Sequence, residues 1–492
     1  MVRSPYVEVA GREGVLGIGK KYKELYILYR CIPLNETRDG RDWSLFTRMK
    51  LEPDYDVVVC GAGPAGIVAA VQAARAGART LLVEKSGILG GTTTLAGVNF
   101  PGLFHAWGRQ IIAGIGWELV ERTAHEEGRP LPDFANYNGF HSRMQVLVNK
   151  AIYAGLADEM VHDSGASVLF HAMPAKVERD GEGWSLTLCL KEGLREVSAH
   201  VLIDATGDAN LVHLAGLPLS RGESKQPGTL IMHAAGYVFE DLDFAVLEQA
   251  FVAAVENGEM LRSDFYAKTN PVRGFLRAKG NNAMHVIGVD GETSQSRTDA
   301  ELQARRAMLR IIRFLRKQPG LEKFHIESFA TECGIRETAG IYGETCITLE
   351  DYVTGRVWPD SVCHSFYPID LHSCDGIGID IRPLEEGVFP TIPLGALLPR
   401  DSRNLIVAGR SACGERMAQS AYRVQASCMA MGQAAGAVAA LAAGQGCELR
   451  EVSLSDLREL LSRHGAIVPE TSHLTDEISA EVETSILRTV EV

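Results

Sequence analysis

The chain lacks the sequence features of metalloproteins, disulfide-linked secreted proteins and nucleic-acid-binding proteins. Its ten cysteines are scattered singly, with no Cys-x-x-Cys pair and no Cys/His spacing typical of zinc. We therefore expect no metal site, and thiols that are buried or incidental in a reducing compartment such as the cytoplasm. The formal net charge is −13 and no basic block occurs. This charge argues against nucleic acid or an anionic membrane as the main partner.

The sequence also has little that could cross or enter a membrane. Its longest run of small apolar residues, 434–444, is too short to span a bilayer and is typical of a packed helix. Residues 1–48 have no sustained apolar stretch of the signal-peptide kind. We interpret residues 1–53 as an N-terminal extension of unknown role. Because Met49 stands just before a strand pattern, residues 1–48 are either an accessory extension or the product of an upstream start codon.

A glycine-rich turn between a strand pattern and a helix pattern is the clearest positive signal. Residues 57–60 are apolar and run into Gly61, Gly63 and Gly66 in Gly-x-Gly-x-x-Gly order, and a second strand ends at Glu84. This order predicts a βαβ unit that binds a dinucleotide, with Gly61 in the tight turn, Gly63 near a pyrophosphate and Gly66 against the strand. The first helical amides favour phosphate, and Glu84 is placed to accept from a ribose hydroxyl. The unit alone does not distinguish NAD from FAD.

The length of 492 residues predicts more than one domain. From about residue 220 to residue 389 the pattern of the sequence changes, with charge-rich helical patterns at 240–260 and 296–318. The remaining patterns predict helices at 114–128 and 142–160, a strand, a turn at Asp180-Gly181 and a second strand over 164–190, and a long helix at 426–444. The predicted domains are a nucleotide-binding domain in two parts (54–219 and 390–447), an inserted domain (220–389), and a terminal helix and tail (448–492).

Three separated motifs together resemble one protein family. They are the Gly61–Gly66 turn with Glu84, the segment IDATGDANL at 203–211, and the segment from Asn404 to Ala442. They resemble the FAD-dependent oxidoreductases related to the fumarate reductase and succinate dehydrogenase flavoproteins, and most of all a broad subgroup known only as FAD-dependent oxidoreductases. Further segments of that pattern occur at 97–119, 333–344, 365–376 and 453–467, so the likeness covers about residues 54–468.

The resemblance implies an α/β fold with a Rossmann-like FAD-binding domain of the glutathione reductase type and an inserted α+β substrate or capping domain. It implies FAD bound non-covalently, because no histidine stands where succinate dehydrogenases attach their flavin. Two positions depart from the pattern: Pro174 has no N–H to offer the adenine, and Arg410 replaces the acid of fumarate reductases, as the subgroup does. The residues that the resemblance assigns to FAD are Gly61, Gly63, Pro64, Ala65, Gly66, Glu84, Lys85, Gly90, Gly91, Thr92, Pro174, Thr206, Gly207, Asp208, Gly409, Arg410, Arg423 and Val424.

Four residues in these motifs are candidates for catalysis: His105, Arg336, His372 and Arg416. His372 either transfers a proton or binds substrate, or it is a buried histidine hydrogen-bonded by Asp370. Arg336 either faces the flavin or forms an internal ion pair with Glu337, and His105 either acts in catalysis or caps a loop. Arg416 stands where many subgroup members have histidine, and this permanent cation favours an anionic substrate.

The predicted function is two-electron dehydrogenation or reduction of a small organic substrate, neutral or anionic, at a C–C or C–OH bond, with hydride passing through flavin N5. No second dinucleotide fingerprint is present, so we expect no dedicated NAD(P)H domain and leave the electron donor or acceptor open. A flavin monooxygenase or halogenase is an alternative, although the halogenase W-x-W-x-I-P signature is absent. A non-catalytic or nucleic-acid-modifying FAD-binding protein is a third. The oligomeric state stays open, with a homodimer as one option.

Overall fold

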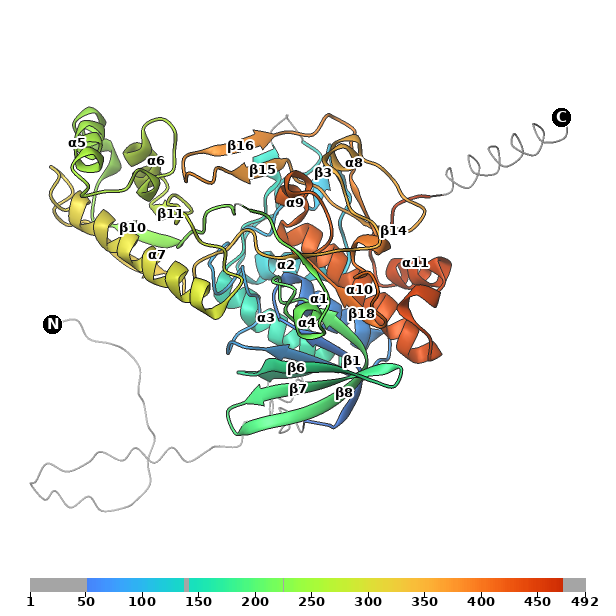
Figure 1. Cartoon of the computed structure of the whole chain (residues 1–492). Coiled ribbons are helices and arrows are strands. Elements are labelled where there is room, and N and C mark those ends of the chain that lie inside the picture. Colours follow the sequence, from blue (N-terminus) through green and yellow to red (C-terminus); the bar gives the residue numbers. More distant parts are fainter. Residues whose placement is uncertain (1–50, 137–140, 224, 472–492) are drawn as a thin grey trace, which may run out of the picture. The chain divides into compact units, whose positions relative to one another are not determined.

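The computed structural model describes residues 51–136, 141–223 and 225–471 (Figure 1). The predicted N-terminal extension, up to residue 50, and the predicted tail after residue 471 lie outside the described residues.

A parallel sheet forms the centre of the nucleotide-binding part, in the order β5-β2-β1-β8, with β18 pairing on the other side of β8. Val57, Val58 and Val59 in β1 are fully buried. Such continuous apolar runs are typical of parallel strands, which are covered on both faces. The five parallel strands are β1 (Asp54–Cys60), β2 (Thr80–Glu84), β5 (Ser167–Phe170), β8 (Gly193–Asp204) and β18 (Leu405–Val407).

The first half of β8 also belongs to an antiparallel meander with β6 (Met173–Asp180) and β7 (Gly183–Leu190). The predicted turn at Asp180-Gly181 is confirmed, because Asp180 pairs with Gly183 across it. The single strand predicted before that turn is wrong, since the segment contains β5 and β6 as two strands. The chain breaks between them at His171, whose φ of 54° is left-handed and ends the extended backbone.

Two helices built from small residues pack against each other: α1 (Pro64–Arg75) and α10 (Gln425–Gln445). A Cβ on Gly432 would lie 2.2 Å from the carbonyl oxygen of Ala65, and one on Gly436 would lie 2.3 Å from that of Ala69. Glycines four positions apart share a helix face, so they permit this close approach. The helix predicted at 426–444 is confirmed. It is long and apolar enough to cross a membrane, but 83% of its most apolar window is buried inside the protein.

Two further predicted helices lie beside α1. The one predicted at 114–128 is confirmed as α2 (Ile115–Glu126), whereas the one predicted at 142–160 begins later, as α3 (Lys150–Asp163). Asn149 caps α3 by accepting from the amides of Ala151 and Ile152, and the amide of Val148 donates to the carbonyl of Asn99 instead of joining a helix. The remaining helices of this part are α4 (Asn210–Leu214), α8 (Leu349–Thr354), α9 (Arg416–Tyr422) and α11 (Leu454–Arg463).

A second hydrophobic core lies between Leu230 and Ile335. Its three-stranded sheet has the order β11-β10-β12, and Figure 1 shows its helices gathered around β10 and β11. Buried apolar residues between Ile347 and Leu398 belong instead to the first core. The elements of the second core are β10 (Met232–Ala235), α5 (Phe244–Glu256), α6 (Pro271–Arg277), β11 (Gly280–Asn281), α7 (Ser294–Leu315) and β12 (His325–Phe329).

Short two-stranded pairs complete the fold, and one of them, the hairpin of β15 and β16, carries His372. With its parallel-dominated sheet, the structure has the predicted α/β fold class. The boundaries at residues 219/220 and 389/390 stay predictions. The short strands are β3 (His105–Ala106), β4 (Arg109–Gln110), β9 (Leu219–Ser220), β13 (Gly340–Ile341), β14 (Ser361–His364), β15 (Ile369–His372), β16 (Ile379–Arg382) and β17 (Thr391–Pro393).

Candidate functional site

A cavity of about 460 Å³ opens where the carboxyl ends of β1, β2, β8 and β18 meet the first residues of α1 and α10. This is the edge at which open α/β sheets bind ligands, and the volume is in the usual range of ligand sites. The opposite wall comes from the second core and from β15, through residues that include Thr229, Ile231, Arg336, Asp370 and His372. The cavity therefore joins the two cores.

The turn before α1 leaves room for an anion. Gly61 has a φ of +94°, and a Cβ there would lie 2.5 Å from the carbonyl oxygen of Ala205. At Gly63, by contrast, a Cβ would meet no described atom within 4 Å. Within the described part of the chain, no side chain caps α1 and no acid stands in its first turn. The first amides of α1 are therefore available to a phosphate.

Glu84 ends β2 beside this turn and is 6% exposed. One carboxylate oxygen accepts from the amide of Ala62 at 2.8 Å, and the other accepts from the amide of Ser86 at 2.8 Å. Each oxygen has a second lone pair, and the residue lines the cavity. The carboxylate is thus fixed in place and can still accept a hydroxyl from a ligand.

Replacing Glu84 by glutamine is expected to weaken FAD binding by about 10- to 100-fold, because a hydrogen bond to a charged group contributes about 1.5–3 kcal/mol. Titrating flavin-free protein with FAD and following flavin fluorescence measures the change in Kd. Glu178→Gln on β6, where the carboxylate pairs only with Lys176 among the described residues, serves as the control. Equal Kd values for the two variants would show that Glu84 does not contact the cofactor.

Asp204, at the end of β8, organises the loop that holds Thr206, Gly207 and Asp208. It is fully buried and accepts from the amide and hydroxyl of Thr206 and from the amides of Leu211 and Val212. Burial raises the pKa of this carboxyl, and the hydrogen bonds oppose the rise. The sequence reasoning assigned no role to Asp204, although an acid between a buried strand and Thr-Gly was a usable signal.

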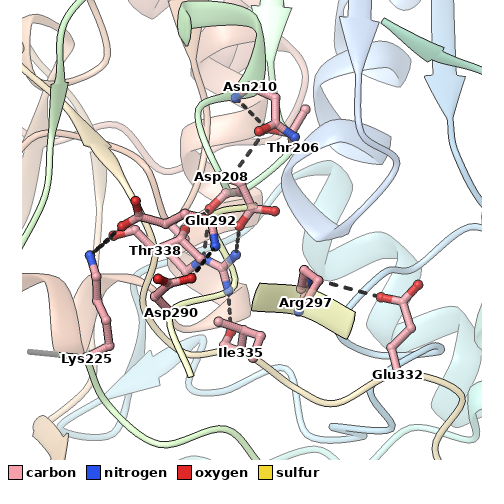
Figure 2. Close-up of polar contacts among 12 residues, drawn as sticks. Thr206, Asp208, Asn210, Lys225, Asp290, Glu292, Arg297, Glu332, Ile335 and Thr338 are labelled. Carbon is pink, nitrogen blue, oxygen red and sulfur yellow. Dashed lines mark hydrogen bonds and ion pairs between the residues drawn. The ribbon is translucent and has the colours of Figure 1, made fainter. Parts of the chain in front are cut away.

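Arg410 joins this loop to the second core. Its guanidinium pairs with Asp208 at 2.5 Å and donates to the carbonyl oxygens of Gly207 and Ile335. Figure 2 shows Asp208 near Ile335, with Thr206 and Asn210 on the other side of it. The same view contains Arg297, a cavity residue of α7, at 3.9 Å from Glu332. The positive charge of Arg410 is therefore largely balanced by the carboxylate of Asp208.

The structure brings most of the predicted cofactor residues to the cavity wall. Gly66 does not line it: a Cβ there would lie 1.8 Å from the carbonyl oxygen of Gly61, so Gly66 allows the close approach of α1 to the turn. Gly90 does not line it either, because it packs on Thr94. The predicted cofactor residues at the wall are Gly61, Gly63, Pro64, Ala65, Glu84, Lys85, Gly91, Thr92, Pro174, Thr206, Gly207, Asp208, Gly409, Arg410, Arg423 and Val424.

Two of the four candidate catalytic residues, Arg336 and His372, line the cavity. Arg336 is 9% exposed and donates to the carbonyl of Pro227 at 2.6 Å and to the side-chain oxygen of Asn282 at 3.0 Å. Burial lowers its pKa to about 10, and the nearby Arg423 adds to the effect. The alternative of an ion pair with Glu337 is not seen, because Glu337 pairs with Arg416.

His372 is 4% exposed, and its nearest hydrogen-bond partner is another histidine. Its Nδ1 lies 2.8 Å from Nε2 of His285, whose own Nδ1 lies 2.9 Å from the carbonyl oxygen of Gly376. Nε2 of His372 lies 3.7 Å from a carboxylate oxygen of Asp370, which is too long for the hydrogen bond of the alternative interpretation. Burial and the charge of Arg336 lower the pKa of His372 to about 4.

His105 and Arg416 do not reach the cavity wall. His105 is buried with its ring stacked on Phe134 at 3.6 Å and edge-on to Trp117. Arg416 pairs with both carboxylate oxygens of Glu337 at 2.9 Å, so its charge is already matched. No local pattern singled out His285 or Gln226, whose side chain accepts from the amide of His372 at 3.1 Å.

Three buried histidines and the partly buried His364 make the protein sensitive to acid. Burial lowers the pKa of His105, His364 and His372 to about 4 and that of His285 to about 2, whereas histidine in the unfolded chain titrates near 6.5. Between these values the unfolded state binds more protons, so stability is retained above about pH 6.5 and lost as the pH falls toward 4. We expect Tm to fall between pH 7 and pH 5 in differential scanning calorimetry; an unchanged or higher Tm at pH 5 would contradict this.

Comparison with known proteins gives the family. The family described as FAD dependent oxidoreductase matches residues 56–461. Digeranylgeranylglycerophospholipid reductase 2 of Methanopyrus kandleri is 30% identical over 170 residues, which are 33% of this chain and 40% of that protein. Urocanate reductase of Eggerthella lenta is 57% identical over 47 residues, 10% of this chain and 8% of that protein. A geranylgeranyl bacteriochlorophyll reductase-like structure from Thermoplasma acidophilum aligns over 83% of this chain and 82% of its own, with 13% identity and a TM-score of 0.37.

The chain belongs to the FAD dependent oxidoreductase family, since the match covers most of its length. It is an oxidoreductase, and its cofactor is FAD. The aligned segments span less than half of each curated relative named above. The cavity residues fit this cofactor: the open space at Gly63 and the uncapped start of α1 suit the pyrophosphate. Glu84 suits a ribose, and among the described residues α10 likewise begins with no capping side chain and no acid.

Proposed function

We propose that the enzyme removes or adds two hydrogens at a C–C or C–OH bond of a small organic substrate. One observation carries the proposal: His372, Asp370, Arg336 and Arg423 lie on the wall of the same cavity that Gly61, Gly63 and Glu84 line. These polar groups come from β15, from residues after the second core and from the end of α9. The grouping supports a substrate position next to the cofactor.

The chemistry needs an electron carrier and a group that handles the proton. Bound FAD supplies the two-electron acceptor or donor. When a substrate loses a hydride from one carbon and a proton from the adjacent carbon or hydroxyl oxygen, His372 is suited to take the proton on Nε2. Burial keeps its ring neutral at pH 7. The carboxylate of Asp370, 3.7 Å away, then stabilises the imidazolium. In the reverse direction the same nitrogen returns the proton.

The charges around His372 favour an anionic substrate. Arg336 and Arg423 contribute two positive charges and Asp370 one negative charge, and all three line the cavity. Burial would raise the pKa of Asp370, but His372, Arg423 and Arg336 hold it below its usual value. The wall is therefore net positive near neutral pH, and a substrate carboxylate would balance it.

Anaerobic mixing tests the proposal. The purified FAD-loaded protein is mixed with single organic acids, polyols and sugars while flavin absorbance is followed, and dithionite provides the fully reduced reference. We expect at least one substrate, most readily a carboxylate, to bleach the flavin within the mixing experiment. If none does and NADPH alone bleaches it, the monooxygenase alternative replaces this proposal.

Within the family, we propose the relationship to fumarate reductase flavoproteins that the sequence motifs favour, together with non-covalent FAD. The loop after β2 contributes Lys85, Gly91 and Thr92 to the cavity wall. None of the described residues that this loop places there is a histidine that could attach the flavin. Acid precipitation of the protein should therefore release all the flavin into the supernatant, where its absorbance is measured. Flavin that stays with the pellet would contradict non-covalent binding.

A further inference from the structure

His285 lies behind His372 and away from the cavity wall. It is 1% exposed, its amide donates to the carbonyl of Ser263, and Tyr266 stacks on its ring with centroids 4.7 Å apart. The residue belongs to the stretch between β11 and α7, far from β15 in the sequence. The stacked ring of Tyr266 and the backbone hydrogen bond to Ser263 thus hold the His285 ring in place.

The carbonyl group of Gly376 that faces His285 is also held in place. Gly376 lies in the turn between β15 and β16, where its amide donates to the carbonyl of Ser373. Its φ is +79°, and a Cβ there would lie 2.7 Å from Cβ of Ser263. The next glycine, Gly378, donates its amide to the carbonyl of Tyr266 at 2.8 Å. The turn therefore cannot easily move its carbonyl away from the ring.

The chain of contacts determines where the protons lie. A carbonyl oxygen only accepts, so Nδ1 of His285 carries a hydrogen and donates to Gly376 at 2.9 Å. A neutral His285 then has a lone pair on Nε2, which accepts from Nδ1 of His372 at 2.8 Å. Since Nδ1 of His372 carries the hydrogen of its neutral ring, Nε2 keeps the lone pair. A histidine's tautomer is set in this way by the bond its other nitrogen makes.

We propose that His285 is a positioning residue that holds His372 in the Nδ1–H tautomer, so that Nε2 is free to accept a proton from substrate. The inference rests on the proposed role of His372. The same contacts serve both protonation states, because an imidazolium keeps its bond to His285 and its new Nε2–H lies 3.7 Å from the Asp370 carboxylate. Proton transfer therefore needs no rearrangement of either ring.

The surroundings favour a neutral pair. Charged groups facing His372 are Asp370 on its own strand, Arg336 from the segment after β12, and Arg423 at the end of α9. Tyr266, 6.5 Å from the His372 ring, is un-ionised near neutral pH because burial raises its pKa. Burial lowers the pKa of His285 to about 2. A proton arriving at the pair thus remains on His372, next to the carboxylate.

Nitrogen NMR of the FAD-loaded protein, labelled with ¹⁵N in the histidine rings, tests this without any substrate. His372→Asn assigns the resonances of His372 by difference. We expect wild-type His372 at pH 7 to show a protonated Nδ1 and an unprotonated Nε2. A resting protein with the hydrogen on Nε2 would overturn the proposal, whatever reaction the enzyme catalyses.

Two variants of His285 distinguish positioning from mere packing. His285→Gln places an amide oxygen near the Nε2 position and can still accept from His372, whereas His285→Asn keeps only the donor to Gly376. We expect the glutamine variant to preserve the Nδ1–H tautomer and the asparagine variant to shift His372 toward Nε2–H. An unchanged tautomer in His285→Asn, with flavin content and circular dichroism like wild type, would also overturn the proposal. If the tautomer is as expected but substrate reduces the flavin of His372→Asn at the wild-type rate, the proposed function fails while the positioning geometry stands.

Discussion

Replacing His372 by asparagine is expected to slow reduction of the flavin by substrate about 100-fold or more, while FAD stays bound. The asparagine amide can occupy the place of Nδ1 and still donate to His285, but it offers no base at the position of Nε2. Losing a positioned acid or base usually lowers the rate by about 10²- to 10⁴-fold. Stopped-flow absorbance under anaerobic conditions, with a substrate identified by the bleaching panel, gives the rate.

His364→Asn is the matched control for this variant. His364 lies in β14 and burial lowers its pKa to about 4, as it does for His372, but the residue does not line the cavity. The control therefore removes a partly buried histidine whose pKa is lowered in the same direction, without touching the site. Equal reduction rates in wild type and His372→Asn would exclude His372 from proton transfer. Equal slowing in both variants would instead point to a general loss of stability.

Replacing Gly61 by alanine is expected to yield protein that binds FAD at least about 100-fold more weakly, or that purifies without flavin. The new Cβ would lie 2.5 Å from the carbonyl oxygen of Ala205, so β1 and the loop after β8 would have to move apart. Both segments line the cavity. An L-residue at a positive φ adds about 1–2 kcal/mol of strain. Flavin content after purification and the Kd from titration measure the effect.

Gly77→Ala separates the collision from the strain. Gly77, after the end of α1, has the same φ of +94°, but a Cβ there would meet no described atom within 4 Å. Both variants place an L-residue at the same positive φ, and only Gly61→Ala has the collision at the cavity. We expect Gly77→Ala to retain its flavin. If it loses flavin as Gly61→Ala does, strain rather than the contact with Ala205 accounts for the loss.

A larger share of the residues predicted to bind the cofactor than of those predicted for catalysis lies on the cavity wall. Gly61, Gly63 and Glu84 act over short sequence distances, since one βαβ unit contains the turn, the helix and the acid. Such local patterns can be read without a structure. The departure at Pro174 is also local: the residue lines the cavity beside Ala172 and Met173, after the unpredicted break at His171.

The reacting end was predicted only in part because its groups are distant in sequence. Arg336 and His372 were named from motifs, and both line the cavity. His105 was named on the same grounds, yet its ring stacks on Phe134. Arg416 was named because a permanent cation there favours an anionic substrate, but its charge is paired with Glu337. A motif shows that a residue type recurs, and it does not show which neighbour uses the charge.

By itself, the sequence determined the fold class, the family resemblance and the glycine turn at Gly61–Gly66, because these depend on periodicity and on glycines a few positions apart. Only the tertiary structure decided that Nδ1 of His372 meets His285 while its Nε2 lies near Asp370, and that Arg336 and Glu337, adjacent in the chain, take different partners. The physical reason is that hydrogen bonds and ion pairs form between groups within about 3–4 Å. Folding places residues 285, 372 and 376 at that distance, and no local pattern encodes it.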